Sequence, residues 1–377
     1  MQTLNYIIWN GSPEIFSIGP ISLRWYGLLW ALGFLITQQI LYYIFKKEGK
    51  PQKDVDTLTI YMVVATIVGA RMGHVIFYEP EMFLNNPLGI ILPFQFTPEF
   101  KFTGYTGLAS HGAAIGILTG LWLYSRKKHP GQNYLQTLDR IVILVCVVGA
   151  LIRFGNFFNS EILGKPTDSS LGVVFINPVT EAIEGYSRES DNLITNVIVK
   201  KSEESIDFQY GRVPIKIFIF FKAGVTEGQA NDYIMNNVKP IMRQYPYIEY
   251  VDDNQIAYRS TETILDKETN QVMVRLNTLG ISRHPAQLYE GISCILLALL
   301  LFYIWSVYKL KLPEGRIFGI FMIILWSLRF AYEYLKEVQV SFEENLPLDM
   351  GQILSIPLVI VGIYVLIRSY RVPQSAA

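Results

Sequence analysis

The sequence predicts a polytopic, all-α membrane protein with seven transmembrane helices and a small α+β domain inserted on the extracytoplasmic side. Composition favours this class, since hydrophobic residues make up 51% of the 377 residues and charged residues only 17%. The mean hydropathy is +0.28, which is typical of a chain that lies largely in lipid. The spacing of the apolar runs, which alternate with charged loops, is the third observation.

A helix needs about 20 mostly apolar residues to cross the roughly 30 Å hydrocarbon core of a bilayer. We expect seven such spans, at residues 25–45, 58–78, 107–124, 141–158, 288–308, 317–334 and 353–370. The third and fourth carry several polar residues, so a buried helix of a soluble fold is the alternative for these two. The first sixteen residues contain no Lys or Arg. A cleavable signal peptide needs a basic region, so the first apolar run is expected to remain as a span.

The short loops predict the orientation of the helices, because cytoplasmic loops carry an excess of Lys and Arg. Positive charge is concentrated after the first, third and fifth spans, in the segments KKEGKPQKD, RKKHPGQ and YKLKLPEGR. The C-terminal tail adds Arg368 and Arg371, whereas the loops on the other side are poor in positive charge. We therefore expect the N-terminus outside and the C-terminus in the cytoplasm.

A long polar segment between the fourth and fifth spans, residues 163–282, is therefore expected outside. Its strand-like runs NVIVKK, IKIFIFF, YIEYV and QVMVRL, with an amphipathic stretch at residues 226–242, are typical of a small α+β fold. The segment contains no His or Cys, so we interpret it as an accessory domain. The predicted division is residues 1–162 for the first four helices, 163–282 for the insert and 283–377 for the last three helices.

Charge and cysteine usage exclude several classes of function. Lys plus Arg and Asp plus Glu both number 32, so the charge balance favours no nucleic-acid partner. Cys146 and Cys294 lie in apolar runs, where we interpret them as small buried residues rather than a disulfide. The four His residues do not have the spacing of metal ligands, so no metal site is predicted.

Ionisable residues inside the predicted spans are the best candidates for function, since each costs several kcal/mol in lipid without a partner. They are Arg71, His74, His111, Arg153, Arg329 and Glu333, with Glu161 at a helix end. In the predicted orientation the arginines, His111 and Glu333 converge with Tyr26 and Tyr289 on the outer half of the membrane. An ion pathway would need polar groups through the whole depth, so a site for outer-leaflet lipid headgroups fits better.

Three arginines at headgroup depth predict an anionic ligand, because the forked guanidinium matches the oxygens of phosphate. Each of the three also has a structural alternative, and for two of them it is specific. Arg329 and Glu333 stand four residues apart and can form an ion pair within one helix. Arg71 can anchor its helix at the interface by snorkelling.

Arg153 is the strongest of the three candidates. It opens the segment RFGNFFNSE, in which Asn156, Asn159 and Glu161 follow on neighbouring turns. Amides and a carboxylate are costly in lipid, so their grouping beside a guanidinium favours a functional role.

Seven motifs at these positions carry a resemblance to a known family. They are FSIGPISLRWYGLLW, GARMGHVIFY, SHGAAIG, IRFGNFFNSE, RHPAQLYE, LRFAYEYLK and MGQILSIP, in this order. With them the chain resembles the bacterial prolipoprotein diacylglyceryl transferases over nearly all of its length outside the insert. Ile152 stands where the family usually has a glycine before the arginine, and Ala113 replaces a second glycine after the histidine. Both changes are conservative, and activity is still expected.

The resemblance implies transfer of the diacylglyceryl group of phosphatidylglycerol to the lipobox cysteine thiol of prolipoproteins, in the bacterial cytoplasmic membrane and without a cofactor. The catalytic residues it implies are His111, Arg153, Arg329, Tyr26, Tyr289 and Glu333. The implied substrate-binding residues are Arg153, Gly155, Asn156, Asn159, Glu161 and Arg71. His111 is the expected base for the thiol, with His284 as the competitor.

A lipid transporter or flippase, or a lipid-binding scaffold without chemistry, is the alternative from another class. Many transporters contain inverted repeats and paired broken helices near the middle of the membrane. The sequence has no such repeat among its seven expected spans, so the transferase interpretation is preferred.

Overall fold

The computed structural model describes residues 5–18, 21–91, 94–95, 101–102, 107, 109–127, 129–190, 193–203, 210–245, 247–249, 261–266, 271–337 and 347–371. Contacts divide the chain into two compact units. Unit 1 contains Met1–Leu29, Ile152–Ile292 and Arg329–Gln352, and unit 2 contains Trp30–Leu151, Ser293–Leu328 and Ile353–Ala377.

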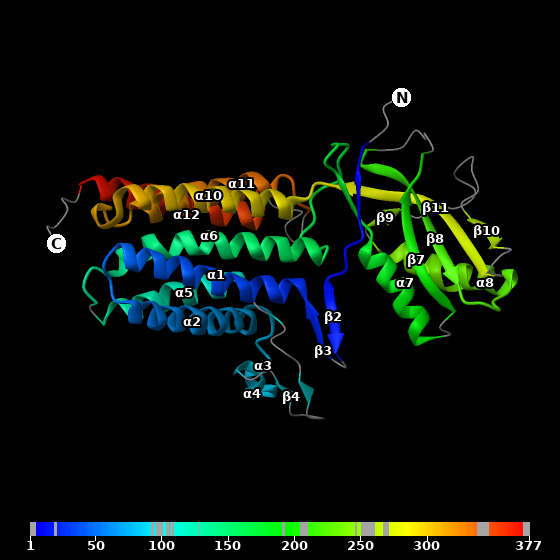
Figure 1. Ribbon diagram of the computed structural model, residues 1–377, viewed down its shortest axis with the longest axis horizontal. Coiled ribbons are helices and arrows are strands. Elements are labelled where there is room, and N and C mark those ends of the chain that lie inside the picture. The colour runs from blue at the N-terminus through cyan, green and yellow to red at the C-terminus, as the bar shows by residue number, and fades with distance from the viewer. Residues whose placement is uncertain are drawn as a thin grey trace. The chain divides into compact units, whose positions relative to one another are not determined.

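Helices occupy all seven stretches in which the sequence predicts spans. They are α1 (Trp25–Lys47), α2 (Gln52–Tyr78), α5 (Ser110–Ser125), α6 (Tyr134–Phe158), α10 (Ala286–Tyr308), α11 (Arg316–Glu333) and α12 (Met350–Arg371) (Figure 1). α2 begins at Gln52 instead of residue 58, and α6 begins at Tyr134 instead of residue 141. Both helices start with polar turns, which hydropathy does not count as part of a span.

Length and composition allow five of the described helices to cross a membrane. They are α1, α2, α6, α12 and α10 together with the 3-10 turn η2 (Lys309–Lys311). α5 has only 16 residues, and α11 has 18 but includes Arg316, Arg329 and Glu333. Large apolar side chains on the helices are exposed, for example Ile60 at 64% and Leu299 at 61%. A water-soluble surface rarely carries so many, so the prediction of a polytopic helical membrane protein is confirmed.

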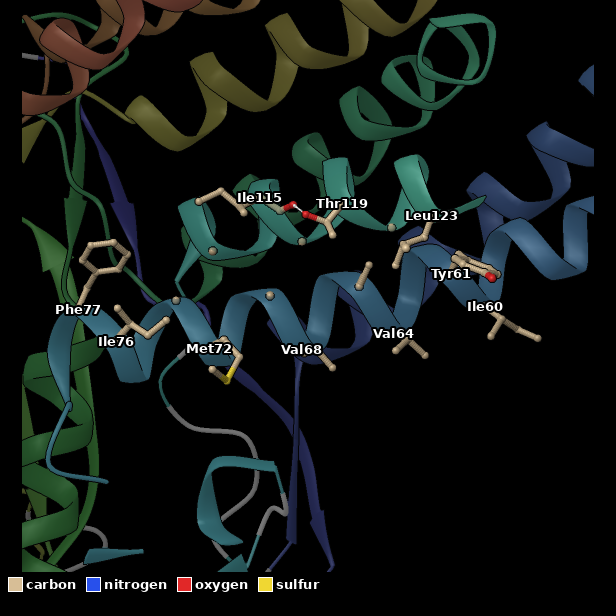
Figure 2. Close-up of a pocket in the computed structure, with 16 residues that line it drawn as sticks. Ile60, Tyr61, Val64, Val68, Met72, Ile76, Phe77, Ile115, Thr119 and Leu123 are labelled. Carbon is tan, nitrogen blue, oxygen red and sulfur yellow. Dashed lines mark hydrogen bonds between the residues drawn. The ribbon is translucent and has the colours of Figure 1, made fainter. Parts of the chain in front are cut away.

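Glycines bring α2 and α5 into close contact within unit 2. A Cβ added at Gly116 would lie 2.2 Å from the carbonyl oxygen of Ala65, and one at Gly69 would lie 2.5 Å from that of Gly112. Small residues at such spacing are the usual means by which helices pack in lipid, where water does not drive association. Figure 2 shows the apolar groove of about 490 Å³ that the two helices line.

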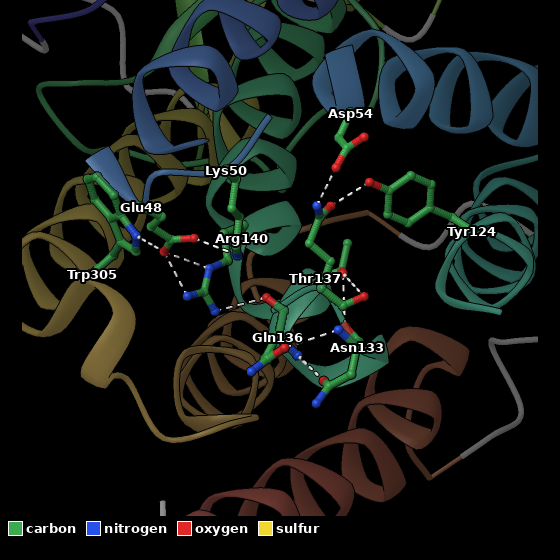
Figure 3. Close-up of polar contacts among 10 residues, drawn as sticks. Glu48, Lys50, Asp54, Tyr124, Asn133, Gln136, Thr137, Arg140 and Trp305 are labelled. Carbon is green, nitrogen blue, oxygen red and sulfur yellow. Dashed lines mark hydrogen bonds and ion pairs between the residues drawn. The ribbon is translucent and has the colours of Figure 1, made fainter. Parts of the chain in front are cut away.

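A buried polar network surrounds Glu48, just after α1 (Figure 3). Its Oε1 accepts hydrogen bonds from Arg140 Nη2 at 2.7 Å and from Trp305 Nε1 at 2.8 Å, while Lys50 Nζ lies 2.6 Å from Oε2. Burial alone would raise the pKa of the Glu48 carboxyl, but Arg140 and Lys50 outweigh burial and hold this pKa below its usual range. The network therefore ties α6 and α10 to the segment that follows α1.

Two further buried carboxylates join helix ends in the same unit. Asp54 of α2 accepts a hydrogen bond of 2.7 Å from the amide nitrogen of Gln132. The amide oxygen of Gln132 in turn accepts a hydrogen bond from the Tyr124 hydroxyl. Asp139 of α6 accepts 2.8 Å bonds from the backbone N–H groups of Gly315 and Phe318. The second carboxylate satisfies donors at the start of α11 that have no partner within the helix.

Unit 1 contains a mixed sheet whose strand order is β1-β6-β11-β8-β7 (Figure 1). Its strands are β1 (Ile7–Trp9), β6 (Val173–Phe175), β7 (Ile194–Lys201), β8 (Arg212–Phe221) and β11 (Gln271–Arg283), and both β9 (Ile248–Glu249) and β10 (Thr261–Asp266) also pair with β11. β1 pairs with β6 in parallel, and the other pairs are antiparallel. Alternate residues of β8 from Ile215 to Phe221 are fully buried, as period-2 patterning requires.

Helices pack on the buried face of this sheet through a shared apolar core. They are α7 (Asn177–Glu189), α8 (Glu227–Tyr233), the π-helix η1 (Ile234–Val238) and α9 (Lys239–Gln244). A capping box between Thr226 and Gln229 starts α8 where the amphipathic stretch begins. The remaining elements are β2 (Glu14–Ile18), β3 (Ile21–Arg24), α3 (Met82–Asn85), α4 (Leu88–Ile91), β4 (Phe94–Gln95) and β5 (Lys101–Phe102).

The four predicted strand runs coincide with β7, β8, β9 and β11, although Tyr250 and Val251 lie outside the described residues. The compact units do not follow the predicted boundaries at residues 162 and 282. Unit 1 adds β1 and the segment around the end of α11 to the residues between α6 and α10. The division into a membrane core and an inserted domain stays a prediction.

Candidate active site

The end of α6 carries the densest group of predicted site residues. The helix ends at Phe158, and the chain then turns through Ser160 and Ile162, which have φ angles of 53° and 58°. A left-handed conformation is strained for a β-branched residue such as Ile162, and strain of this kind is frequent at functional sites. The turn holds Glu161 beside the last turn of α6.

Hydrogen bonds join Arg153 to the polar residues after it. Arg153 Nη1 donates to Asn156 Oδ1 at 3.4 Å, and Asn156 Nδ2 donates to Glu161 Oε1 at 2.6 Å. Asn159 Nδ2 donates to the same oxygen at 3.2 Å. Gln287 of α10 donates to the Glu161 carbonyl oxygen at 2.5 Å. The predicted group therefore forms one connected set of contacts, which α10 supports.

Two ionisable residues that were not among the predicted site residues complete this group. Glu290 Oε2 of α10 lies 2.5 Å from Arg153 Nε. The other carboxylate oxygen of Glu290 pairs with the ammonium of Lys336, which also lies 3.3 Å from Glu333 Oε1. Glu333 in turn lies 3.7 Å from Arg329 Nη2, so the alternative of an ion pair within α11 is realised. Glu290 falls inside the span predicted at residues 288–308, so a full list of ionisable residues in the spans would have included it.

Gly155 allows close packing against Tyr26. A Cβ at residue 155 would lie 3.0 Å from the Tyr26 Cα and 2.9 Å from its ring. The glycine therefore brings the start of α1 against the last turns of α6, beside Arg153 and Asn156.

Tyr289 and His284 lie at the start of α10. His284 Nδ1 is 3.4 Å from the Tyr289 hydroxyl, and the Tyr332 hydroxyl donates to the Tyr289 carbonyl oxygen at 3.4 Å. Burial lowers the pKa of His284, so its imidazole is neutral at pH 7 and can accept a proton.

Arg71 and His111 belong to unit 2, unlike the residues above. Arg71 is buried, and its guanidinium donates to the carbonyl oxygens of Gly89 at 2.9 Å and Ile90 at 3.3 Å. These bonds hold the segment after α2, whereas a part in substrate binding stays a prediction. His111 is exposed in the first turn of α5, and its ring packs edge-on against Phe77 with 4.9 Å between the centroids.

Comparison with known proteins decides the family. A family model described as prolipoprotein diacylglyceryl transferase matches residues 13–368. The chain belongs to the prolipoprotein diacylglyceryl transferase family. The match includes every predicted site residue from Tyr26 to Glu333.

Several bacterial transferases of this family are similar to the chain over nearly their whole length. Each of the following is named phosphatidylglycerol–prolipoprotein diacylglyceryl transferase. The Bacteroides fragilis protein is 32% identical over 95% of this chain and 93% of its own. The Chloroherpeton thalassium protein is 30% identical, with 99% and 98% coverage, and that of Tolumonas auensis is 29% identical, with 97% and 98% coverage.

Proposed function

We propose that this chain transfers the diacylglyceryl group of phosphatidylglycerol to the lipobox cysteine of prolipoproteins, the first step of lipoprotein maturation. Family membership supports the reaction type, and the names of the relatives pair phosphatidylglycerol with prolipoprotein. The single observation that carries the proposal in this chain is the Arg153 group at the end of α6. There a partly exposed guanidinium is fixed from both sides by Glu290 and Asn156.

The chemistry requires a cation at the leaving group. The thiol sulfur attacks C3 of the glyceryl unit, a sulfur–carbon bond forms, and the carbon–oxygen bond to phosphate breaks. Glycerol phosphate leaves with the growing negative charge on its oxygens. A guanidinium directed at those oxygens stabilises the transition state more than the ground state. Arg153 and Arg329 take this role.

The thiol proton needs an acceptor, because a thiol with a pKa near 8.5 is only a few per cent ionised at neutral pH. His111 is the proposed base, and His284 is the competitor. Tyr26 and Tyr289 would donate hydrogen bonds to headgroup or ester oxygens. The two guanidiniums would be oriented by Asn156, Asn159, Glu161 and Glu333. Gly155 would keep Tyr26 close to Arg153. Arg71 would contribute to lipid binding.

The seven helices span the cytoplasmic membrane of a bacterium in this proposal, with the N-terminus outside and the C-terminus in the cytoplasm. α5 and α11 cross it together with the five longer helices, because their polar residues face protein or substrate. The sheet of unit 1 then lies outside as an accessory domain.

A direct test is to incubate the purified protein with a lipobox peptide and phosphatidylglycerol. The peptide should gain the mass of one diacylglyceryl unit, and a peptide with serine in place of cysteine should not. A transporter, flippase or lipid-binding scaffold would leave the peptide unchanged, and that result would exclude the transferase activity.

A further inference from the structure

Lys336 holds a fixed position at the end of α11. The side chain is only 4% exposed. Its backbone forms an antiparallel bridge with Gly164, and the neighbouring Lys165 N–H donates to the Leu335 carbonyl oxygen at 2.7 Å. The segment after α11 is therefore bound to the segment after α6, so the ammonium has little freedom to move.

The ammonium of Lys336 lies between two carboxylates that each hold an arginine. One carboxylate belongs to Glu290, whose second oxygen lies 2.5 Å from Arg153 Nε. The other belongs to Glu333, whose Oε1 lies 3.3 Å from Lys336 Nζ and 3.7 Å from Arg329 Nη2. Lys336 is thus the middle member of a chain of ion pairs with an arginine at each end.

This row of ion pairs contains three cations and two carboxylates, all of them partly or fully shielded from water. A carboxylate that already binds an ammonium attracts a neighbouring guanidinium less strongly, because part of its charge is neutralised. If Lys336 were absent, the carboxylates of Glu290 and Glu333 would attract the two arginines more strongly. They would then compete with any phosphate for the same N–H groups. The balance of attraction therefore depends on a residue that needs no contact with the substrate.

We infer that Lys336 is a positioning residue for phosphate recognition. Its charge weakens the attraction of Glu290 for Arg153 and that of Glu333 for Arg329. This inference rests on the proposed function. It assigns to Lys336 an effect on the transition state, where negative charge grows on the phosphate, and not only on the stability of the fold.

The test compares two substitutions of Lys336 with a matched control. Lys336→Met should lower kcat about tenfold or more and leave the KM for phosphatidylglycerol within about threefold, because the lost interaction matters mainly in the transition state. Lys336→Arg keeps the charge and should retain kcat within about threefold. Arg140→Met removes another cation that is 4% exposed but is paired with Glu48 in unit 2. This control should lower the unfolding temperature while leaving kcat per folded molecule nearly unchanged.

Three outcomes decide the matter. If Lys336→Met, like the control, changes only the unfolding temperature, the residue is merely structural and the inference is wrong. If Lys336→Arg is as inactive as Lys336→Met although folded, charge is not the reason, which also overturns the inference. If the unmodified protein binds fluorescent phosphatidylglycerol but transfers nothing, the proposed function fails. The inference about Lys336 then fails with it, whereas the first two outcomes overturn the inference alone and leave the transfer activity of the unmodified protein intact.

Discussion

Arg153 is held by two neighbours that leave part of its guanidinium available. Glu290 engages Nε, Asn156 engages Nη1, and 20% of the side chain is exposed. The arginine is thus oriented before a ligand arrives, which lowers the entropy lost when a phosphate binds.

Replacement of Arg153 or Arg329 by alanine should therefore lower transfer by at least about a hundredfold, the usual loss when a preorganised donor to a developing anion is removed. Lysine should restore little, since a point charge cannot reproduce the planar fork. Initial rates with a lipobox peptide measure both effects. Arg188→Ala, at an exposed position of α7, is the control and should retain the normal rate. A folded, membrane-inserted alanine variant with most of its activity would contradict the assignment.

The two candidate bases differ in their surroundings. His284 lies beside Tyr289, and burial keeps it neutral at pH 7, whereas His111 is exposed in unit 2. A base role does not require a preformed contact with the arginines, because catalytic contacts often form only when the substrate binds.

Substitution by glutamine separates the two candidates. We expect His111→Gln to lower the rate by roughly a hundredfold at neutral pH, and a higher pH to recover part of it as the substrate thiol ionises unaided. His284→Gln should show a smaller loss that does not depend on pH. Rates from about pH 6.5 to 9 provide the comparison, over a range that includes the unperturbed thiol pKa. The opposite pattern would transfer the base role to His284.

At the level of single residues, the sequence predicted contacts within the end of α6 better than contacts between helices. Arg153, Asn156 and Glu161 are close in sequence, so helical periodicity was enough to group them. Glu290 and Lys336 reach Arg153 and Arg329 only because the ends of three helices meet, and a single sequence does not state which helices are neighbours. The contacts of Arg71 with backbone carbonyl groups depend in the same way on the path of the loop after α2.

Buried ion pairs, in addition to apolar contacts, join helix ends in unit 2. Glu48 is fully buried with Arg140, Lys50 and Trp305 around it. Removal of one member of a buried ion pair usually costs about 3 to 5 kcal/mol, because the remaining charges lose their partner. The network is thus a means of holding α6 and α10 to the end of α1.

Glu48→Gln should therefore lower the unfolding temperature strongly, while Asp56→Asn, at an exposed position of α2, should change it little. The pH dependence has a defined sign. The pKa of Glu48 is lowered in the folded protein, so its stabilisation is present above the unfolded pKa of about 4.3 and is lost as the pH falls through the folded pKa. Thermal unfolding at pH 7 and at acid pH measures both effects. Equal stability of the two variants would refute a structural role for the network.

Long-range pairing organises unit 1 as a whole. β1, near the N-terminus, joins β6 in parallel, and the Tyr6 hydroxyl donates to the Pro214 carbonyl oxygen at 2.5 Å. The sequence predicted β7, β8, β9 and β11 by their alternation, but three-residue strands such as β1 and β6 have patterns too short to be recognised. For the same reason the compact unit extends beyond the predicted boundaries of the insert.

A hydrogen bond from the strand-rich region reaches the turn that carries Glu161. The Tyr247 hydroxyl donates to the carbonyl oxygen of Ser160, the residue before Glu161, at 3.2 Å. This bond supports the strained turn after α6. It is the reason to expect that the insert influences the rate, although none of the proposed catalytic residues lies in it.

Replacement of residues 184–279 by a short Gly/Ser linker is therefore predicted to spare the chemistry but to reduce its rate. The deletion leaves Arg153, Glu161, Glu290 and Lys336 in place, and a flexible linker can join the remaining ends if they are neighbours. Transfer to a free lipobox peptide should persist at a measurable rate, and Tyr247→Phe in the full chain should reproduce part of the loss. If a well-inserted deletion variant bound lipid normally yet transferred nothing even to the short peptide, the insert would have to be part of the active site, because loss of one supporting hydrogen bond of about 1 kcal/mol cannot abolish catalysis.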